Sequence, residues 1–339
     1  MDPGELNRFA ADLDALNPPR ARLGEGDRSA QLNGGGASSN ENKPLGLAIS
    51  GGPDSLALLL LAHAARPGEI EAATVDHRLR PAARAECEAV AAICKTLAIP
   101  HAILTARWAV PPSANLQAEA RAERYALLAD WATSRALTAV ATAHHADDQA
   151  ETLLMRLARG SGVGGLAGTR PSRPLTATIP LIRPLLGWRK ADLAAIVVAA
   201  GLAPADDPAN RDPRHDRARM RAWLGETGWA DPERLAASAS HLRDADEALD
   251  WASTALADAR LVRDGDAIKL DPAGLPREFQ RRLLLKAFAQ LDALPPRGPD
   301  LANAMTALGN GETCTLAGLK LEGGPKWRLT RAPPRARRS

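Results

Sequence analysis

The sequence predicts an α/β fold in which a parallel, doubly wound sheet is followed by a smaller, mainly helical domain. The first observation is an alternation of short apolar runs with segments of helical period, which begins at Leu45 and continues to Arg159. Elements that alternate in this way form parallel sheets, because right-handed crossovers place helices on both faces. The second observation is a long amphipathic segment, residues 232–260, which is typical of a separate helical region.

The apolar runs and helical segments can be assigned in chain order. The expected strands are residues 45–50, 70–76, 101–105 and 138–144. The expected helices are residues 54–65, 82–97, 116–134, 147–159 and 189–200. Hairpin patterns are expected near residues 261–270 and 314–329. Ligands of parallel sheets bind at the carboxyl ends of the strands, so the residues that follow each strand are candidates for function.

Composition divides the chain into four parts. Residues 17–43 are rich in Gly, Asn, Ser, Pro and charge, and residues 1–16 have only a weak helical pattern, so a flexible N-terminal extension is expected over residues 1–43. The α/β domain is expected over residues 44–224 and the mainly helical domain over residues 225–330. Residues 331–339 form a basic tail. This tail is either solvated or an arm that contacts a nucleic-acid backbone through Arg335 and Arg337.

The composition excludes several classes of protein. The 339 residues carry a net charge of +3, which permits a polyanionic partner without requiring one. Cys87, Cys94 and Cys314 form no CxxC pair, so neither a disulfide framework nor a zinc or iron–sulfur site is expected. The sequence contains no signal-peptide pattern and no apolar run of membrane-spanning length. We therefore expect a soluble, cytoplasmic protein without a membrane partner.

Residues 45–55, LGLAISGGPDS, contain the most informative functional pattern. The apolar run ends at Gly51 and Gly52, and a second apolar segment with helical spacing follows Asp54. Glycines in such a turn let backbone N–H groups approach a ligand, and the helix N-terminus favours an anion. The pattern predicts a phosphate-binding loop, although not a Walker loop, because GxxxxGK[ST] is absent. The alternative is an ordinary turn in which Asp54 caps the helix.

Residues 160–165, GSGVGG, match the dinucleotide motif GxGxxG but lack its context. They follow a helical segment instead of a strand, and no acidic residue occurs between Leu166 and Lys190 to bind a ribose. We therefore expect a loop at this position, either a moving loop or a plain connector.

A dense polar cluster, HHADDQAE, follows the expected strand at residues 138–144. Asp148 and Glu151 are three residues apart and share one face of the expected helix. Carboxylates at this edge of the sheet suit Mg²⁺ or an ammonium group. Two alternatives are that the acids complement the helix dipole while His144 caps the helix, and that His144 and His145 bind a transition metal.

The helix expected over residues 116–134 begins with two arginines on one side, Arg121 and Arg124. Two guanidinium groups at this spacing suit a charge that develops on phosphate. The alternative is that they pair with glutamates on a solvated surface.

Six segments carry a resemblance to a known family. They are SGGPDS, VDHRLR (75–80), NLQAEARAERY (115–125), residues 142–168, IRPLL (182–186) and residues 207–221. Together they resemble the N-type ATP pyrophosphatases of the PP-loop family and, within that family, the tRNA(Ile)-lysidine synthetases. The family motif DHGLR is present here with Arg78 in place of glycine.

The resemblance implies a reaction and its partners. ATP adenylates C2 of the wobble cytidine of a CAU-anticodon tRNA(Ile), and free L-lysine displaces AMP to form lysidine. The implied cofactors are ATP and Mg²⁺. The oligomeric state is left open, with a homodimer among the alternatives.

The resemblance also implies roles for individual residues. The implied ATP-binding residues are Ser50, Gly51, Gly52, Asp54, Ser55, Asp76 and His144, and Asp54 is also the metal ligand. Asp148 and Glu151 correspond to lysine-binding positions, and together with Asp54 and Arg121 they form the expected catalytic group. Arg217 and Arg221 are expected to bind tRNA, with Arg335 and Arg337 of the tail.

Two other functions compete with this one. A tRNA thiolase of the same loop family would normally contain catalytic cysteines or a CxxC cluster, which this chain lacks. A non-catalytic RNA-binding relative would be favoured by loss of the loop, whereas Gly51, Gly52 and Asp54 are intact.

Overall fold

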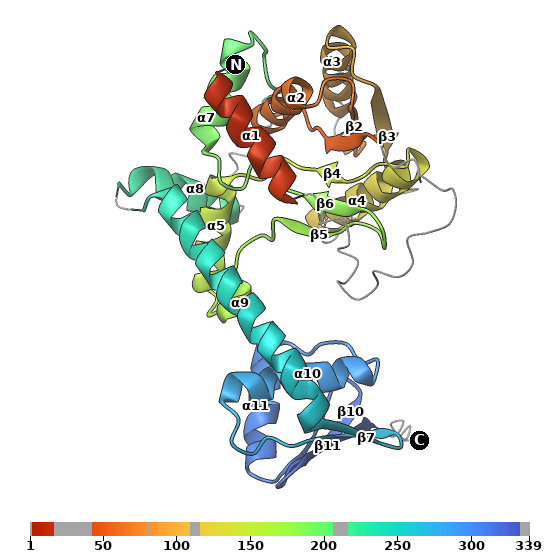
Figure 1. Cartoon of the computed structure of the whole chain (residues 1–339), viewed down its shortest axis with the longest axis vertical. Coiled ribbons are helices and arrows are strands. Elements are labelled where there is room, and N and C mark those ends of the chain that lie inside the picture. Colours follow the sequence, from red (N-terminus) through yellow and green to blue (C-terminus); the bar gives the residue numbers. More distant parts are fainter. Residues whose placement is uncertain are drawn as a thin grey trace, which may run out of the picture. The chain divides into compact units, whose positions relative to one another are not determined.

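The computed structural model describes residues 2–16, 43–79, 82–108, 116–205, 216–228 and 230–332 (Figure 1). The chain divides into two compact units, Met1–Arg243 and Asp244–Ser339. The division falls within helix α9 (Pro232–Arg260), later in the chain than the boundary expected after residue 224. The first turns of α9 therefore belong to the larger unit, which the helical pattern alone could not indicate.

The larger unit contains a six-stranded sheet in the order β3-β2-β1-β4-β6-β5. Its strands are β1 (Leu45–Ala48), β2 (Ile70–Asp76), β3 (His101–Thr105), β4 (Val140–Ala141), β5 (Ser172–Pro174) and β6 (Pro180–Ile182). Neighbouring strands are parallel except for the antiparallel pair β5 and β6. Because β1 lies between β2 and β4, the loop that follows β1 is central at the carboxyl edge of the sheet.

Helices cover both faces of this sheet (Figure 1). Leu45, Leu47 and Ile49 pack on one face with α1 (Pro3–Leu16), α2 (Pro53–Ala65), α3 (Ala82–Thr96) and α7 (Lys190–Ala199). Ala48 packs on the other face with α4 (Leu116–Ser134). Successive strand residues alternate between the faces, so both faces are buried. The doubly wound parallel sheet is confirmed.

Most of the expected elements have bounds close to those predicted. β2, β3, α4 and α9 match, and α5 (Ala146–Leu157) lies within two residues of its expected bounds. β4 is much shorter than the strand expected over residues 138–144, because only Val140 and Ala141 pair with β1 and β6 before the chain turns into α5. The hairpin expected near residues 261–270 is formed by β7 (Leu261–Asp264) and β8 (Ala267–Leu270).

Helix α1 corrects the expectation of a flexible extension over residues 1–43. Phe9 and Leu13 are fully buried in the core of the larger unit. The indole N–H of Trp188 donates a hydrogen bond of 2.8 Å to Asp12, and the Arg8 guanidinium lies 4.4 Å from the Trp188 ring. Only one stripe of α1 is apolar, so its pattern is weak in the sequence. Residues 17–42 lie outside the described residues.

Some elements carry little sequence signal. Helix α8 (Asp216–Glu226) lies in a polar block that was not assigned to a helix, and none of its residues is fully buried. The strands β5 and β6 have three residues each, too few for a visible alternation. The glycine-rich segment expected to be a loop contains one short helix, α6 (Val163–Leu166).

The smaller unit contains an antiparallel sheet in addition to helices. The strands β7 and β8 are joined by β9 (Thr313–Leu316), β10 (Leu319–Glu322) and β11 (Trp327–Arg331) in the order β7-β8-β11-β10-β9. The core is shared with α10 (Arg277–Gln290) and α11 (Gly298–Gly309), and Phe288, Leu308 and Trp327 are buried in it. The two hairpin patterns expected near residues 261–270 and 314–329 thus join into one five-stranded sheet, so the smaller unit contains a sheet as well as helices. None of the described helices combines the length and apolar composition needed to cross a membrane.

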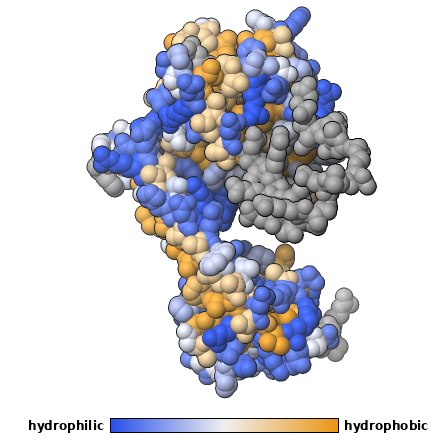
Figure 2. Space-filling view, in the orientation of Figure 1, coloured by the Kyte–Doolittle hydropathy of each residue, from blue (hydrophilic) through white to orange (hydrophobic). Residues whose placement is uncertain are grey.

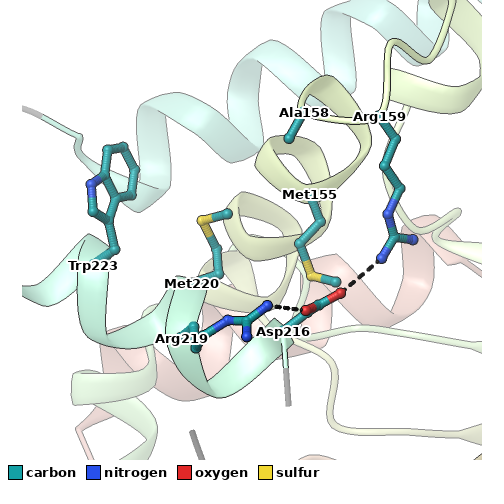
Figure 3. Close-up of a pocket in the computed structure, with 7 residues that line it drawn as sticks. All are labelled: Met155, Ala158, Arg159, Asp216, Arg219, Met220 and Trp223. Carbon is teal, nitrogen blue, oxygen red and sulfur yellow. Dashed lines mark hydrogen bonds and ion pairs between the residues drawn. The ribbon is translucent and has the colours of Figure 1, made fainter. Parts of the chain in front are cut away.

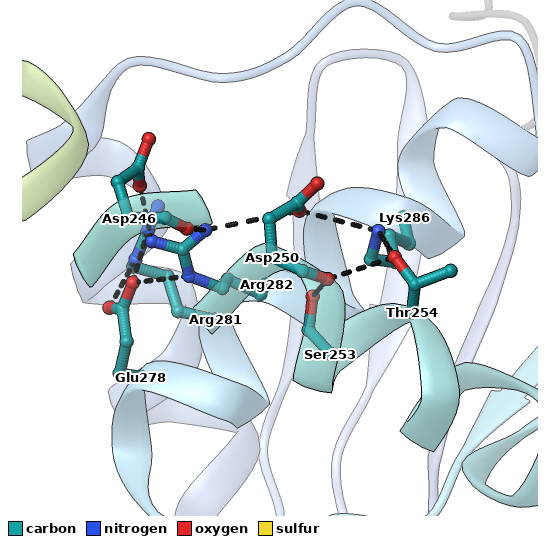
Figure 4. A network of polar contacts seen from close by, with 8 residues as sticks. All are labelled: Asp246, Asp250, Ser253, Thr254, Glu278, Arg281, Arg282 and Lys286. Atoms are coloured by element: carbon teal, nitrogen blue, oxygen red, sulfur yellow. Dashed lines mark hydrogen bonds and ion pairs between the residues drawn. The ribbon is translucent and has the colours of Figure 1, made fainter. Parts of the chain in front are cut away.

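A buried ion pair connects α9 and α10 inside the smaller unit (Figure 4). Arg282 and Asp246 are 8% and 6% exposed, and the guanidinium also donates to Glu278 at 2.9 Å. Arg281 pairs with the same Glu278, but both side chains are more than one-third exposed. Removing one partner of a buried pair leaves the other charge poorly solvated, whereas an exposed pair contributes little.

We expect Arg282→Ala to lower the free energy of unfolding by about 3 kcal/mol, because the Asp246 carboxylate then lacks its guanidinium partner. Arg281→Ala, the matched control, should lower it by less than about 1 kcal/mol. Urea unfolding of the full chain, followed by circular dichroism, measures both values. Equal losses in the two variants would show that burial of the pair does not determine its contribution.

Candidate active site

The loop between β1 and α2 has the geometry of an anion-binding turn. Gly51 has a φ of +87°, in the region that favours glycine. The Ser50 N–H donates to the Ser55 hydroxyl at 3.2 Å, and that hydroxyl donates to the Gly52 carbonyl at 2.9 Å. The Ala205 N–H donates to the Gly51 carbonyl at 2.9 Å. Ser50 and Ser55, both expected at the phosphate site, therefore fix the shape of the turn.

The N-terminus of α2 is not capped by a side chain. The N-cap residue is Gly52, Pro53 is the first helical residue, and Asp54 lies in the first turn. The alternative in which Asp54 caps an ordinary turn is therefore wrong. An uncapped helix N-terminus at the centre of the carboxyl edge suits a bound phosphate.

His145 connects this loop to α5. Its side chain is buried, and its Nε2 atom lies 3.5 Å from Asp54 and 3.6 Å from Asp148, while Nδ1 lies 3.6 Å from Asp147. Burial favours the neutral ring, but hydrogen bonds to Asp147 and Asp54 and the charge of Asp148 outweigh it and raise the pKa of His145 to about 10. His145 thus lies among three carboxylates that favour its protonated form, an arrangement that the sequence did not indicate.

Asp147 and Asp148 have separate structural roles. The Asp147 carboxylate accepts a hydrogen bond of 2.8 Å from the Lys190 N–H at the start of α7. Burial raises the pKa of Asp147, but the hydrogen bonds from His145 and Lys190 lower it to about 2. Asp148 is the third residue of α5, and its carboxylate accepts the backbone N–H of His145, the N-cap residue, at 3.2 Å. The first bond thus joins the start of α5 to the start of α7, and the second closes the first turn of α5.

His144 is neutral, unlike its neighbour. Its Nδ1 atom lies 3.1 Å from the Thr142 hydroxyl. Burial lowers the pKa of His144 to about 3, with a further contribution from Arg183. The two histidine side chains have different partners, and the described residues contain no group of three or more His, Cys, Asp or Glu side chains arranged to hold a metal ion.

Glu151 is buried and paired with arginines of α8. The Arg221 Nε donates to Glu151 at 2.7 Å, and the Arg217 Nε lies 3.9 Å from the same carboxylate. The Glu151 side chain is only 1% exposed. The structure thus brings together residues expected to bind two different substrates, lysine and tRNA.

Asp76 and Arg121 lie at the same edge of the sheet. Asp76 is buried and accepts the Arg78 N–H at 2.9 Å, which shapes the turn after β2. Arg78 has a φ of +55°, so the glycine of the family motif is replaced by a residue in the left-handed region. Arg121 is exposed. Its charge helps to lower the pKa of His144, although burial of the ring and the charges of Arg183 and Arg124 contribute more.

A pocket of about 300 Å³ lies between α5 and α8, beyond Glu151 (Figure 3). Met155, Met220 and Trp223 give it apolar walls. Asp216 pairs with Arg159 and Arg219 at its rim. Hydrophilic residues gather on the surface of α8 (Figure 2). Arg335 and Arg337, the other expected tRNA contacts, and residues 206–215 lie outside the described residues.

Comparisons with known proteins give consistent results. Residues 28–227 match the model of the PP-loop domain family. The tRNA(Ile)-lysidine synthase of Novosphingobium aromaticivorans is 47% identical over 334 residues, which cover 97% of this chain and 94% of that protein. That of Zymomonas mobilis is 44% identical over 295 residues, covering 86% and 89%. The U34-tRNA thiolase NcsA of Methanococcus maripaludis shares the fold, with a TM-score of 0.53 at 15% identity over 71% of this chain and 80% of that one.

The parallel sheet, the glycine turn after β1 and the family match define a PP-loop domain, the ATP-binding domain of the ATP pyrophosphatases. The sequence identity to the relatives and the share of the chain that it covers then determine the family within this class. It belongs to the tRNA(Ile)-lysidine synthase family.

Proposed function

We propose that the protein uses ATP to adenylate C2 of the wobble cytidine in a CAU-anticodon tRNA(Ile) and then ligates free L-lysine at that carbon. The observation that carries the proposal is that a glycine turn and the acidic side chains of α5 lie close together at one sheet edge. The uncapped glycine turn suits a pyrophosphate, and Asp148 with the buried Glu151 suits an ammonium group. Membership of the lysidine synthase family supports both assignments.

In the first step, the cytosine O2 attacks the α-phosphorus of ATP, and the bond between the α-phosphorus and the bridging oxygen breaks. Pyrophosphate leaves with the bond electrons. The turn formed by Ser50, Gly51 and Gly52 contributes by holding this leaving group with backbone donors and the N-terminus of α2. Arg121, exposed beside His144, suits the charge that develops on the α-phosphate.

In the second step, the lysine amine attacks C2, the bond from C2 to the adenylate oxygen breaks, and AMP leaves. The amine transfers its proton to water or to a neighbouring carboxylate of α5. Asp148 and Glu151 hold and orient the lysine through charge-assisted hydrogen bonds. Because Arg221 already pairs with Glu151, the lysine either displaces this guanidinium or binds beside it.

Asp54 fits the role of a magnesium ligand. Its Oδ1 atom is buried and has no hydrogen-bond partner, and a hard cation is bound in ATP sites by one or two carboxylates together with phosphate oxygens. Bound Mg²⁺ would supply positive charge that neutralises the pyrophosphate. The Nε2 atom of His145 lies 3.5 Å from the second oxygen of Asp54 and so orients the carboxylate.

The thiolase alternative is not favoured by the cysteines. Cys87 and Cys94 are buried in α3, and burial raises the pKa of both thiols, to about 11 for Cys94. Burial likewise raises the pKa of Cys314, which lies in the smaller unit. The nucleophilic thiolate is therefore disfavoured at all three positions.

We expect the purified protein, given ATP, Mg²⁺, labelled lysine and a CAU-anticodon tRNA(Ile) transcript, to incorporate lysine and to release AMP and pyrophosphate in equal amounts. A transcript with U in place of the wobble C is the control, because it lacks the cytosine that reacts. Absence of lysine from a transcript that the protein binds would contradict the proposal.

A further inference from the structure

Three arginines lie around Tyr125, and the proposed reaction uses only one of them, Arg121. This arginine cluster consists of Arg121, Arg173 and Arg183. The Arg121 and Arg173 guanidinium carbons lie 5.0 Å and 4.3 Å from the centre of the Tyr125 ring. Cation–π contacts of this kind hold guanidinium groups in place without neutralising their charge. Burial raises the pKa of Tyr125, but Arg121 and its neighbours outweigh it and lower that pKa.

The cluster joins helix α4 to the strands β5 and β6. Arg121 and Tyr125 are one turn apart on α4, Arg173 lies in β5, and Arg183 follows β6 directly (Figure 1). The strand order places β6 two strands from β1, which is about 10 Å at the usual strand spacing. The cluster is therefore distinct from the phosphate loop. Arg121 and Arg183 are nevertheless near enough to His144 to add to the lowering of its pKa that burial causes.

The cluster has an excess of positive charge. Within the part of the chain that the structure describes, none of its three arginines forms an ion pair with a carboxylate. Arg183 is only 3% exposed, and its Nε atom is buried without a hydrogen-bond partner. By contrast, Arg135, Arg221 and Arg282 each pair with a glutamate or an aspartate. A buried guanidinium without a counter-ion is unfavourable, so the cluster favours an anionic ligand.

Planar guanidinium groups suit phosphate oxygens, with which they form two parallel hydrogen bonds. The pyrophosphate of ATP is assigned to the loop after β1, so a second phosphate site two strands away suits a different molecule. The RNA strand supplies such phosphates, because the backbone on each side of the reacting cytidine must lie near His144 and Arg121. Phosphate contacts of this kind position a nucleic acid without specifying its sequence.

We propose that the arginine cluster around Tyr125 binds a backbone phosphate of the RNA next to the modified cytidine through Arg173 and Arg183, while Arg121 remains assigned to the α-phosphate of ATP. This inference rests on the proposed function, because it takes the RNA substrate from it. Arg173 contacts the phosphate, and the buried Arg183 adds positive charge behind it. Tyr125 positions Arg121 and Arg173 through its ring.

The test uses Arg173→Gln in the full chain, with Arg66→Gln as the matched control. Arg66 follows α2 at the opposite edge of the sheet and pairs with Asp14, so its loss removes the same charge far from the cluster. The Kd for a CAU-anticodon tRNA(Ile) transcript is measured over a series of salt concentrations, and the Kd for ATP is measured without RNA. Arg183→Gln is a second variant, and thermal melting checks the fold of all three.

We expect Arg173→Gln to weaken RNA binding about tenfold and to reduce the slope of log K against log salt by roughly 0.7 to 0.9. ATP binding should stay within about twofold of the unchanged protein, as should RNA binding by Arg66→Gln. Weaker ATP binding with unchanged RNA binding would assign the cluster to the nucleotide and overturn the inference. Unchanged binding of both ligands by folded variants would overturn it as well.

These outcomes are separate from those of the proposed function. The RNA-binding measurement needs no catalysis, whereas the proposed function is tested by lysine incorporation in the unchanged protein. If the unchanged protein incorporates lysine and the Arg173→Gln variant binds RNA equally well, the proposed function is retained and only this inference is lost.

Discussion

Gly51→Ala is expected to reduce kcat/KM for ATP in lysine incorporation by about 100-fold, the scale seen when one preorganised donor to a developing anion is lost. Gly51 has a φ of +87°, which an alanine adopts only with strain. A Cβ at this position would also lie 3.2 Å from the Val90 side chain. The turn must therefore shift, and its N–H groups then no longer point at the leaving pyrophosphate.

Gly68→Ala is the matched control for this prediction. Gly68 has a φ of +78°, but no atom lies within 4 Å of the added Cβ, and the turn follows α2 at the opposite edge of the sheet. Both variants should lose about 1 to 2 kcal/mol of stability from the strained backbone. Steady-state kinetics together with urea unfolding separate the two effects. A similar loss of activity in both variants would show that strain, and not the phosphate turn, is responsible.

Glu151→Gln is expected to raise KM for lysine by about 50-fold, because a neutral amide cannot supply the negative charge that binds an ammonium group in a buried site. KM for ATP should change by less than about threefold, since Glu151 lies on α5 and not in the loop after β1. Gln has nearly the shape of Glu, so packing around the buried side chain is preserved. Initial rates of lysine incorporation, with each substrate varied in turn, measure both constants.

Glu71→Gln provides the control for the loss of a buried, arginine-paired glutamate. Glu71 accepts two hydrogen bonds from Arg135, at 2.8 Å and 2.7 Å, and lies at the start of β2, away from the carboxyl edge. This variant should lose stability while its KM for lysine stays unchanged. Equal increases in the KM values for lysine and ATP in Glu151→Gln would argue against a lysine-binding role.

Local sequence patterns were sufficient for the loop after β1 and for α5, but not for α8, which carries Arg217 and Arg221. The alternation of apolar runs determined the order of strands and helices, and two glycines after β1 indicated the turn that Gly51 adopts. The spacing of Asp148 and Glu151 placed both on α5. Helix α1 is underestimated from the sequence because one apolar stripe, which includes Phe9 and Leu13, is enough to hold the helix on the core. The short strands β5 and β6 are not predicted, because three residues are too few to show an alternation of apolar and polar side chains.

The partners and charges of the side chains were decided only by the tertiary structure. His144 and His145 are adjacent in the sequence, yet one has a pKa of about 3 and the other of about 10, because only His145 faces Asp54 and Asp147. Glu151 pairs with Arg221, and Arg183, which follows β6, reaches Tyr125 on α4. Periodicity reports on neighbours along the chain, whereas charge states depend on groups that folding brings together. The sequence by itself determined the fold class and the phosphate turn, and the tertiary structure decided how the surrounding charges are arranged.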